Sequence, residues 1–199
     1  MIREKIIPGV LLTGGKSRRL GVDKAMLVFD GEALAVRSGR ILNAVCEMAI
    51  EVGDGVSNLS HVREQPVGEG PLAALLAGVD EIIRRDASID GGVLLLACDL
   101  PRMTETVLLR VLDDPHSTSI PNVSDRLQYG CAKYGEEMIA EMRDRFRQGE
   151  RSFRGIRSLD RSRWAPIEDA DQQIEGWTTA FRDIDTPQDA ADLGINLKS

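Results

Sequence analysis

The sequence predicts an α/β fold in which helices cover both faces of a mainly parallel sheet. Apolar, strand-like runs alternate with amphipathic, helix-like segments, and this alternation is the pattern of βα units. The run Gly92–Ala97 is apolar throughout, which is typical of a central strand buried on both faces. The length of 199 residues fits a single domain spanning residues 1–199, large enough for a sizeable core.

The first half of the chain supplies most of the regular pattern. We expect a strand at Val10–Leu12 and a helix at Ala33–Ala44, whose apolar residues fall roughly on one face. A second strand is predicted at Met48–Val52. A second helix is predicted at Pro71–Arg85, because proline is well tolerated in the first turn of a helix. The strand Gly92–Ala97 follows it.

The second half is less regular. Glu136–Arg147 has the spacing of an amphipathic helix. Residues 148–163 are rich in Arg, Ser and Gly and are expected to include a mobile segment. Phe181–Asp185 is predicted as a late short strand. Thr186 is predicted to cap a last helix, Pro187–Leu193, with proline at its first position.

Composition excludes several classes of protein. The net charge of −7 argues against general nucleic-acid binding. There is no 18-residue apolar run and no signal-peptide-like N-terminus, so we expect a cytoplasmic protein without a membrane span. The three cysteines are widely spaced and are predicted to be buried, reduced thiols rather than metal ligands: Cys46, Cys98 and Cys131.

The segment from Gly9 to Lys24 is the most informative part of the chain. Its strand runs into Gly14 and Gly15, which allow backbone N–H groups to approach a bulky anion. Four cationic side chains follow within nine residues: Lys16, Arg18, Arg19 and Lys24. This arrangement favours a triphosphate site, although residues such as Lys16 and Arg18 also fit a solvated basic loop.

Two standard phosphate motifs do not match this segment. A Walker A loop ends in Gly-Lys-Ser, which Gly15 to Ser17 supply, but Val10 stands where its first glycine is needed. The dinucleotide fingerprint Gly-x-Gly-x-x-Gly has no match there either. The loop is therefore of a different kind.

An aspartate directly follows the third predicted strand. Ligands of open α/β sheets bind beyond the carboxyl ends of the strands, and Asp99 stands at such an end. A carboxylate near a triphosphate is well placed to hold Mg²⁺. Taken alone, Asp99 fits equally well as a turn residue before Pro101.

Three motifs in order carry a resemblance to a known family. Residues 12–24 read Leu-Thr-Gly-Gly-x-Ser-x-Arg-Leu-Gly-x-Asp-Lys, which resembles the signature of the molybdenum-cofactor guanylyltransferases. Residues 68–78 contain the similar Gly-Pro-Leu-Ala segment, and residues 183–189 resemble the family's Thr-Pro ending. The resemblance reaches both ends of the chain. It implies a three-layer α/β/α, Rossmann-like fold of the GT-A type.

The resemblance also implies a reaction, in which GMP passes from GTP to the terminal phosphate of molybdenum-bearing molybdopterin and pyrophosphate leaves. That phosphate is already ionised at neutral pH, so positioning and charge stabilisation would suffice. By resemblance, the catalytic residues are Arg19, Lys24 and Asp99, and the Mg²⁺ ligands are Asp99 and Asp185. The implied nucleotide-binding residues are Leu12, Thr13, Gly14, Gly15, Lys24, Glu64, Gly70, Pro71, Leu72 and Asp99.

The chain departs from the family's pattern in three places. Gly53 follows the second strand where asparagine is common, and Glu64 stands for an aspartate of the next loop. Residues 128–133 replace a later proline-containing segment of the family. Leu-Thr-Gly-Gly and Gly-Pro-Leu nevertheless favour guanine over cytosine. Alternatives are cytidylyl transfer to molybdopterin, transfer to phospholactate or a sugar phosphate, and a catalytically weak nucleotide-binding regulator.

The resemblance also implies the binding partners. The expected ligands are GTP and a molybdopterin-type cofactor, with transient contacts to cofactor-delivering proteins or molybdoenzymes. We expect a monomer or a weak homo-oligomer.

Overall fold

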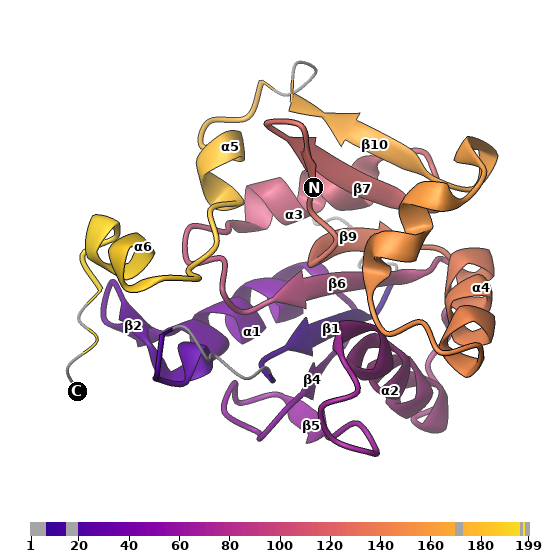
Figure 1. Cartoon of the computed structure of the whole chain (residues 1–199), viewed down its shortest axis with the longest axis horizontal. Coiled ribbons are helices and arrows are strands. Elements are labelled where there is room, and N and C mark those ends of the chain that lie inside the picture. The colour runs from indigo at the N-terminus through magenta and orange to yellow at the C-terminus, as the bar shows by residue number, and fades with distance from the viewer. Residues whose placement is uncertain (1–6, 15–19, 170–172, 196, 198–199) are drawn as a thin grey trace.

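A central sheet organises the protein in a computed structural model, which describes residues 7–14, 20–169, 173–195 and 197 (Figure 1). Its strand order is β10-β7-β9-β6-β1-β4-β5, with β8 paired to β7. The strands are β1 Gly9–Leu12, β4 Ala49–Val52, β5 Ser60–Val62, β6 Val93–Ala97, β7 Ser119–Val123, β8 Arg126–Leu127, β9 Cys131–Tyr134 and β10 Ala165–Glu168. A separate hairpin joins β2 Val28–Phe29 to β3 Glu32–Ala33.

The sheet is mixed but mainly parallel. β1 runs parallel to both β4 and β6, and β4 runs parallel to β5. β9 lies antiparallel between β6 and β7, and β10 is again parallel to β7. The carboxyl ends of β1, β4, β5 and β6 therefore meet at one edge. The sheet prediction is confirmed.

Six α-helices are assigned in the described residues: α1 Leu34–Val45, α2 Pro71–Arg84, α3 Glu105–Asp113, α4 Glu136–Arg147, α5 Trp177–Ala180 and α6 Pro187–Asp192. The described residues also contain the 3-10 helices η1 Lys24–Met26, η2 Phe153–Ser158 and η3 Arg161–Arg163. None of the helices in these parts of the chain is long and apolar enough to cross a membrane.

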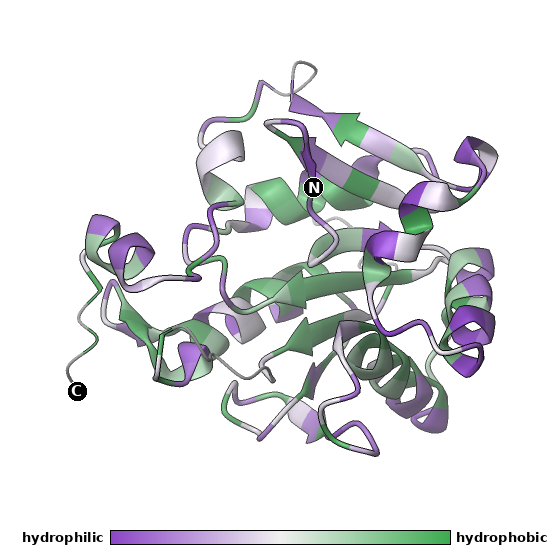
Figure 2. Ribbon diagram, viewed as in Figure 1, coloured by the Kyte–Doolittle hydropathy of each residue, from purple (hydrophilic) through white to green (hydrophobic). Residues whose placement is uncertain are grey.

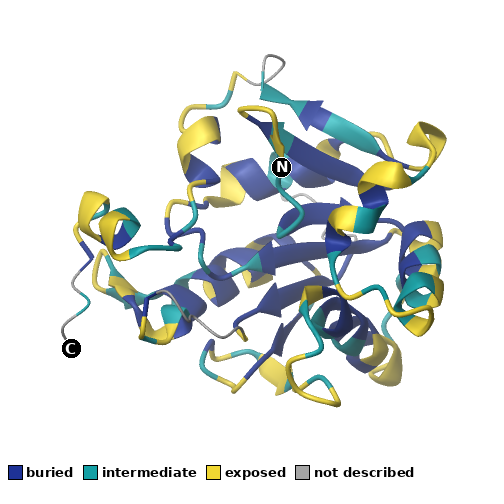
Figure 3. Ribbon diagram, in the orientation of Figure 1, coloured by how far each residue is buried: buried dark blue, intermediate teal, exposed yellow. Residues whose placement is uncertain are grey.

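Alternating side chains of the strands build three layers. Leu11 of β1 packs in one cluster with residues of α1 and α3, whereas Val10 and Leu12 pack with residues of α2 and α4. The central strands are the most hydrophobic and most buried part of the molecule (Figures 2 and 3). Helix α2 packs very close to β1 at Gly78. A Cβ at this position would lie only 2.7 Å from a methyl group of Val10. The three cysteines are buried, as predicted, and none of them forms a disulfide.

One expectation about the second half is wrong. Residues 181–185 do not form a strand: Phe181 caps the end of α5, and the segment passes the sheet with one bond from the Ile184 N–H to the carbonyl of Asp99 (3.1 Å). The segment 148–163 contains η2 and η3, and Phe153 and Ile156 of η2 are buried in the core, while its expected mobility stays a prediction. The predicted last helix is confirmed, as α6.

Candidate active site at the carboxyl ends of the central strands

Lys24 lies between two carboxylates from distant parts of the chain. Its Nζ is 3.2 Å from Oδ2 of Asp99 and 2.5 Å from Oδ1 of Asp185. The side chains are 17% exposed for Lys24, 27% for Asp99 and 48% for Asp185. Three residues predicted to act together are thus brought together, and they remain open to solvent on one side.

Local structure explains this convergence. The side chain of Asp23 accepts a hydrogen bond from the N–H of Ala25 (3.0 Å) and so starts η1, whose first residue is Lys24. Asp99 lies two residues beyond the end of β6. Its carbonyl accepts the bond from Ile184, which fixes the following Asp185 beside it. The side chain of Thr186 then caps α6 by accepting from the N–H of Asp189.

Electrostatics at this site favour a bound cation. Burial would lower the pKa of Lys24, but its hydrogen bonds to Asp185 and Asp99 and their negative charge raise it, so the ammonium is retained. Burial, followed by the nearby charges of Asp185 and Asp99, raises the pKa of Asp183. One ammonium therefore lies between the two carboxylates of Asp99 and Asp185, and the carboxyl group of Asp183 is near both, so the balance of charge is negative.

The donor set fits Mg²⁺. In the described part of the chain, no three His, Cys, Asp or Glu side chains gather as a metal site by themselves. Asp99 and Asp185 offer two carboxylates at one point. Mg²⁺ is commonly held by one or two carboxylates together with substrate phosphates and water, so such a pair is an adequate protein share of the ligands.

The first loop begins beside this site. The N–H of Thr13 bonds to the carbonyl of Val52 (3.2 Å), which keeps the chain in line with β4 beyond the end of β1. Leu12 and Thr13 are largely buried, whereas Gly14 is exposed. Gly15 and Arg19, which were predicted to bind the nucleotide, lie outside the described residues, as do Lys16 and Arg18 between them. Their roles therefore stay predictions.

The second motif opens α2 at the same edge of the sheet. Gly70 has a φ of 98°, in the region that favours glycine, and a Cβ there would lie 2.6 Å from the carbonyl of Arg151. Pro71 is the first helical residue, and Leu72 is buried in the core. The loop is thus pinned against the chain that follows α4, and its predicted contact with the nucleotide stays a prediction.

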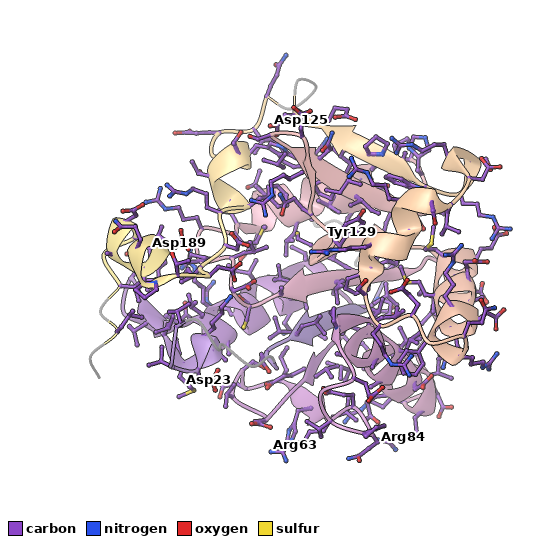
Figure 4. All side chains as sticks on the ribbon, viewed as in Figure 1. Asp23, Arg63, Arg84, Asp125, Tyr129 and Asp189 are labelled. Atoms are coloured by element: carbon purple, nitrogen blue, oxygen red, sulfur yellow. The ribbon has the colours of Figure 1, made fainter. Side chains whose placement is uncertain are left out.

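Glu64 lies apart from the Lys24 cluster. Its carboxylate accepts from the N–H of Gly68 (3.1 Å), and it lines a groove of about 510 Å³ between β5, α2 and α4. Arg63 and Arg84 line the same groove, and Figure 4 shows both well separated from Asp189 on α6. Among the described residues, no hydrogen bond or ion pair joins the Glu64 side chain to the Lys24 cluster, and its role in nucleotide binding stays a prediction.

Two features of the site were missed from the sequence. Asp183 belongs to the acidic group, and the repeated Asp-x-Asp spacing before Thr186 was the available signal. Glu51 is completely buried on β4 and bonded to the hydroxyl of Thr13 (2.6 Å). In the sequence, Glu51 is the one charged residue of an otherwise apolar predicted strand. This could have indicated a functional or structural role, because a buried charge needs partners.

Comparison with known proteins identifies the family. Residues 9–165 match the MobA-like NTP transferase domain. A protein of Opitutus terrae named "Probable molybdenum cofactor guanylyltransferase" is 31% identical over 166 residues, which cover 79% of this chain and 81% of the relative. The "Molybdenum cofactor guanylyltransferase" of Syntrophotalea carbinolica is 28% identical over 164 residues, covering 75% of this chain and 73% of the relative.

Solved structures share the fold. The molybdopterin-guanine dinucleotide biosynthesis protein A of Archaeoglobus fulgidus matches 94% of this chain and 96% of its own, with a TM-score of 0.71 and 18% identity. A nucleotidyl transferase from Methanothermobacter also has a TM-score of 0.71, with 20% identity and 96% of both chains covered. The chain belongs to the MobA-like NTP transferase family and is a nucleotidyltransferase.

Proposed function

We propose that the protein transfers GMP from GTP to the terminal phosphate of molybdenum-bearing molybdopterin and releases pyrophosphate. The observation that carries the proposal is the placement of Lys24 between Asp99 and Asp185, beside the glycine-rich first loop. The names of the relatives from Opitutus and Syntrophotalea support the choice of GTP and molybdopterin.

The reaction needs orientation and charge stabilisation more than proton transfer. An oxygen of the acceptor's phosphate attacks the α-phosphorus of GTP, the new P–O bond forms, and the bond to the leaving pyrophosphate breaks with its electron pair. Lys24 would bind phosphate oxygens and offset this negative charge, and Asp99 and Asp185 would hold Mg²⁺. When bound, the ion would withdraw negative charge from the phosphate oxygens.

Arginines near Tyr129 support an anionic acceptor. Tyr129 precedes Gly130, whose carbonyl accepts from the N–H of Ala97 at the end of β6 (2.7 Å), so it lies on the β9 side of the site (Figure 4). Its ring stacks on Phe153 at the start of η2, with ring centroids 6.5 Å apart. Burial raises the pKa of Tyr129. The positive charges of three nearby arginines partly offset this effect by lowering the pKa: Arg157, Arg154 and Arg161.

An acceptor screen tests the proposal. The purified protein is incubated with Mg²⁺ and each of four NTPs, with and without molybdopterin, phospholactate or a sugar phosphate, and pyrophosphate is measured. We expect release with GTP that depends on molybdopterin. Release with another acceptor would replace the proposed substrate, and GTP binding without release under any condition would favour a regulator.

A further inference from the structure

The buried carboxylate of Glu51 has no part in the proposed transfer, yet all its hydrogen-bonding capacity is used. Its Oε1 accepts from the hydroxyl of Thr13 (2.6 Å) and from the N–H groups of Gly55 (2.9 Å) and Val56 (3.1 Å). Its Oε2 accepts from the N–H (2.8 Å) and the hydroxyl (2.5 Å) of Ser57. One side chain thus joins the loop after β1 to the loop after β4.

The charge on Glu51 is maintained by these donors. Burial alone would raise its pKa, but the bonds from Ser57, from Thr13 and from backbone N–H groups outweigh burial and lower it. The group is therefore ionised at neutral pH. A buried charge is costly when a donor is withdrawn, so the two loops are held in one arrangement around it.

Gly53 completes the arrangement by leaving space. It follows β4 directly, and its N–H bonds to the carbonyl of Val62 (2.9 Å). A Cβ at this position would overlap the hydroxyl oxygen of Thr13 and lie 3.1 Å from Oε1 of Glu51. The φ of Gly53 is outside the left-handed region, so the neighbouring hydroxyl, rather than the backbone, excludes a side chain here.

We propose that Thr13, Glu51 and Gly53 form one positioning unit for the bound nucleotide. Glu51 holds the hydroxyl of Thr13 and thereby fixes the backbone of Thr13 and Gly14, which would contact the nucleotide. Gly53 leaves the space that the hydroxyl of Thr13 occupies. The inference rests on the proposed function, because a nucleotide lies at the ends of β1 and β4 only if a nucleoside triphosphate binds there.

A double-mutant cycle tests the unit. GTP and CTP binding are measured by calorimetry for the wild type, Thr13→Ala, Gly53→Ala and the double variant, with melting temperatures alongside. Thr13→Ala should weaken GTP binding about fivefold and Gly53→Ala at least about tenfold, since each removes Thr13 from the carboxylate. The double variant should bind GTP better than Gly53→Ala alone, because the overlapping hydroxyl is gone.

Two further variants keep the test valid if Gly53→Ala does not fold. Thr13→Ser retains the hydroxyl and should retain wild-type affinity, whereas Thr13→Val removes it and should lose about as much as Thr13→Ala. The matched control is Thr118→Val. Thr118 is also buried, and its hydroxyl accepts from the N–H of Gly135 (2.9 Å). It directly precedes β7, so it lies at the amino end of that strand, away from the carboxyl ends of β1 and β4. This control should lower the melting temperature without changing GTP affinity.

The outcomes separate two failures. A wild-type protein that binds neither GTP nor CTP would overturn the proposed function. Wild-type GTP binding that Thr13→Val leaves unchanged, or a cycle in which the two single effects simply add, would overturn the positioning unit alone.

Discussion

Replacing Lys24 separates a catalytic role from a structural one. Lys24→Met removes the ammonium and keeps most of the side-chain length. The three side chains of the cluster are 17%, 27% and 48% exposed, so both ion pairs are partly solvated. Pairs of this kind contribute about 0–1 kcal/mol each, so the loss of both lowers stability by no more than about 2 kcal/mol. In a protein of this size that is roughly 4–8 °C in melting temperature.

The expected effect on catalysis is larger. In the proposed reaction, negative charge moves onto the leaving pyrophosphate in the transition state. Lys24, which is held by Asp99 and Asp185, would offset this charge. Removing one preorganised charge-stabilising donor typically costs about 10²–10³ in rate, or roughly 3–4 kcal/mol. We therefore expect kcat/KM for GTP to fall at least about a hundredfold.

Pyrophosphate release at saturating acceptor and the melting temperature are measured together. Lys133→Met is the matched control. Lys133 is buried, and its Nζ donates to the carbonyls of Leu112 (3.3 Å) and Asp114 (2.6 Å), away from the carboxyl end of β6. It should lose stability and keep kcat/KM. A Lys24→Met protein with a large fall in melting temperature and unchanged kcat/KM would refute the catalytic assignment.

Three further predictions follow from the site. Asp99→Asn should keep the circular dichroism spectrum and lose turnover by orders of magnitude, because it removes a charge that is proposed to bind Mg²⁺. Near-normal turnover at saturating Mg²⁺ would contradict this. The kcat/KM for GTP should exceed that for CTP by at least about a hundredfold. The wrong base would leave one or two buried hydrogen bonds unpaired, which costs roughly 3 kcal/mol. Equal use of both nucleotides would contradict guanine specificity. Asp183 has a raised pKa in the folded protein, so the folded state binds its proton more tightly than the unfolded state, and stability falls as pH rises through that raised pKa. Asp183→Asn should therefore raise the melting temperature at pH 7, with a gain that shrinks toward pH 4, and equal shifts at both pH values would refute the burial argument.

The elements that local pattern specifies were predictable. β1, α2 and β6 have continuous or periodic apolar residues, and Asp99 was placed correctly because a strand must end before it. β7, β9 and β10 were missed because they carry residues that weaken a strand pattern, such as Pro121, Lys133 and Pro166. Their pairing depends on neighbours distant in sequence.

The segment 181–185 was predicted as a strand, but it forms none. Its apolar residues Phe181 and Ile184 lie three positions apart rather than in strict alternation, and Ile184 is buried in a cluster with Leu34. The segment makes only one backbone bond to the chain after β6, so no ladder forms. Its extended course nevertheless presents Asp183 and Asp185 to Asp99, which is what the site requires.

The departure at Gly53 has a physical reason that the sequence alone did not reveal. A side chain there would overlap the hydroxyl of Thr13, and that hydroxyl is bonded to Glu51. Thr13 follows a different strand from Glu51 and Gly53 and lies 38 residues from Glu51 in the sequence. Their coupling becomes visible only when β1 and β4 are paired in register.

Transfer of a labelled nucleotide tests the central claim most directly. The purified protein, Mg²⁺, molybdenum-bearing molybdopterin and GTP labelled at the α-phosphorus are incubated, and the products are separated. We predict that the label appears in a guanine dinucleotide of the pterin, with one pyrophosphate released per transfer and almost none with Asp99→Asn. GTP that binds but leaves all of its label unincorporated would contradict the proposed transfer.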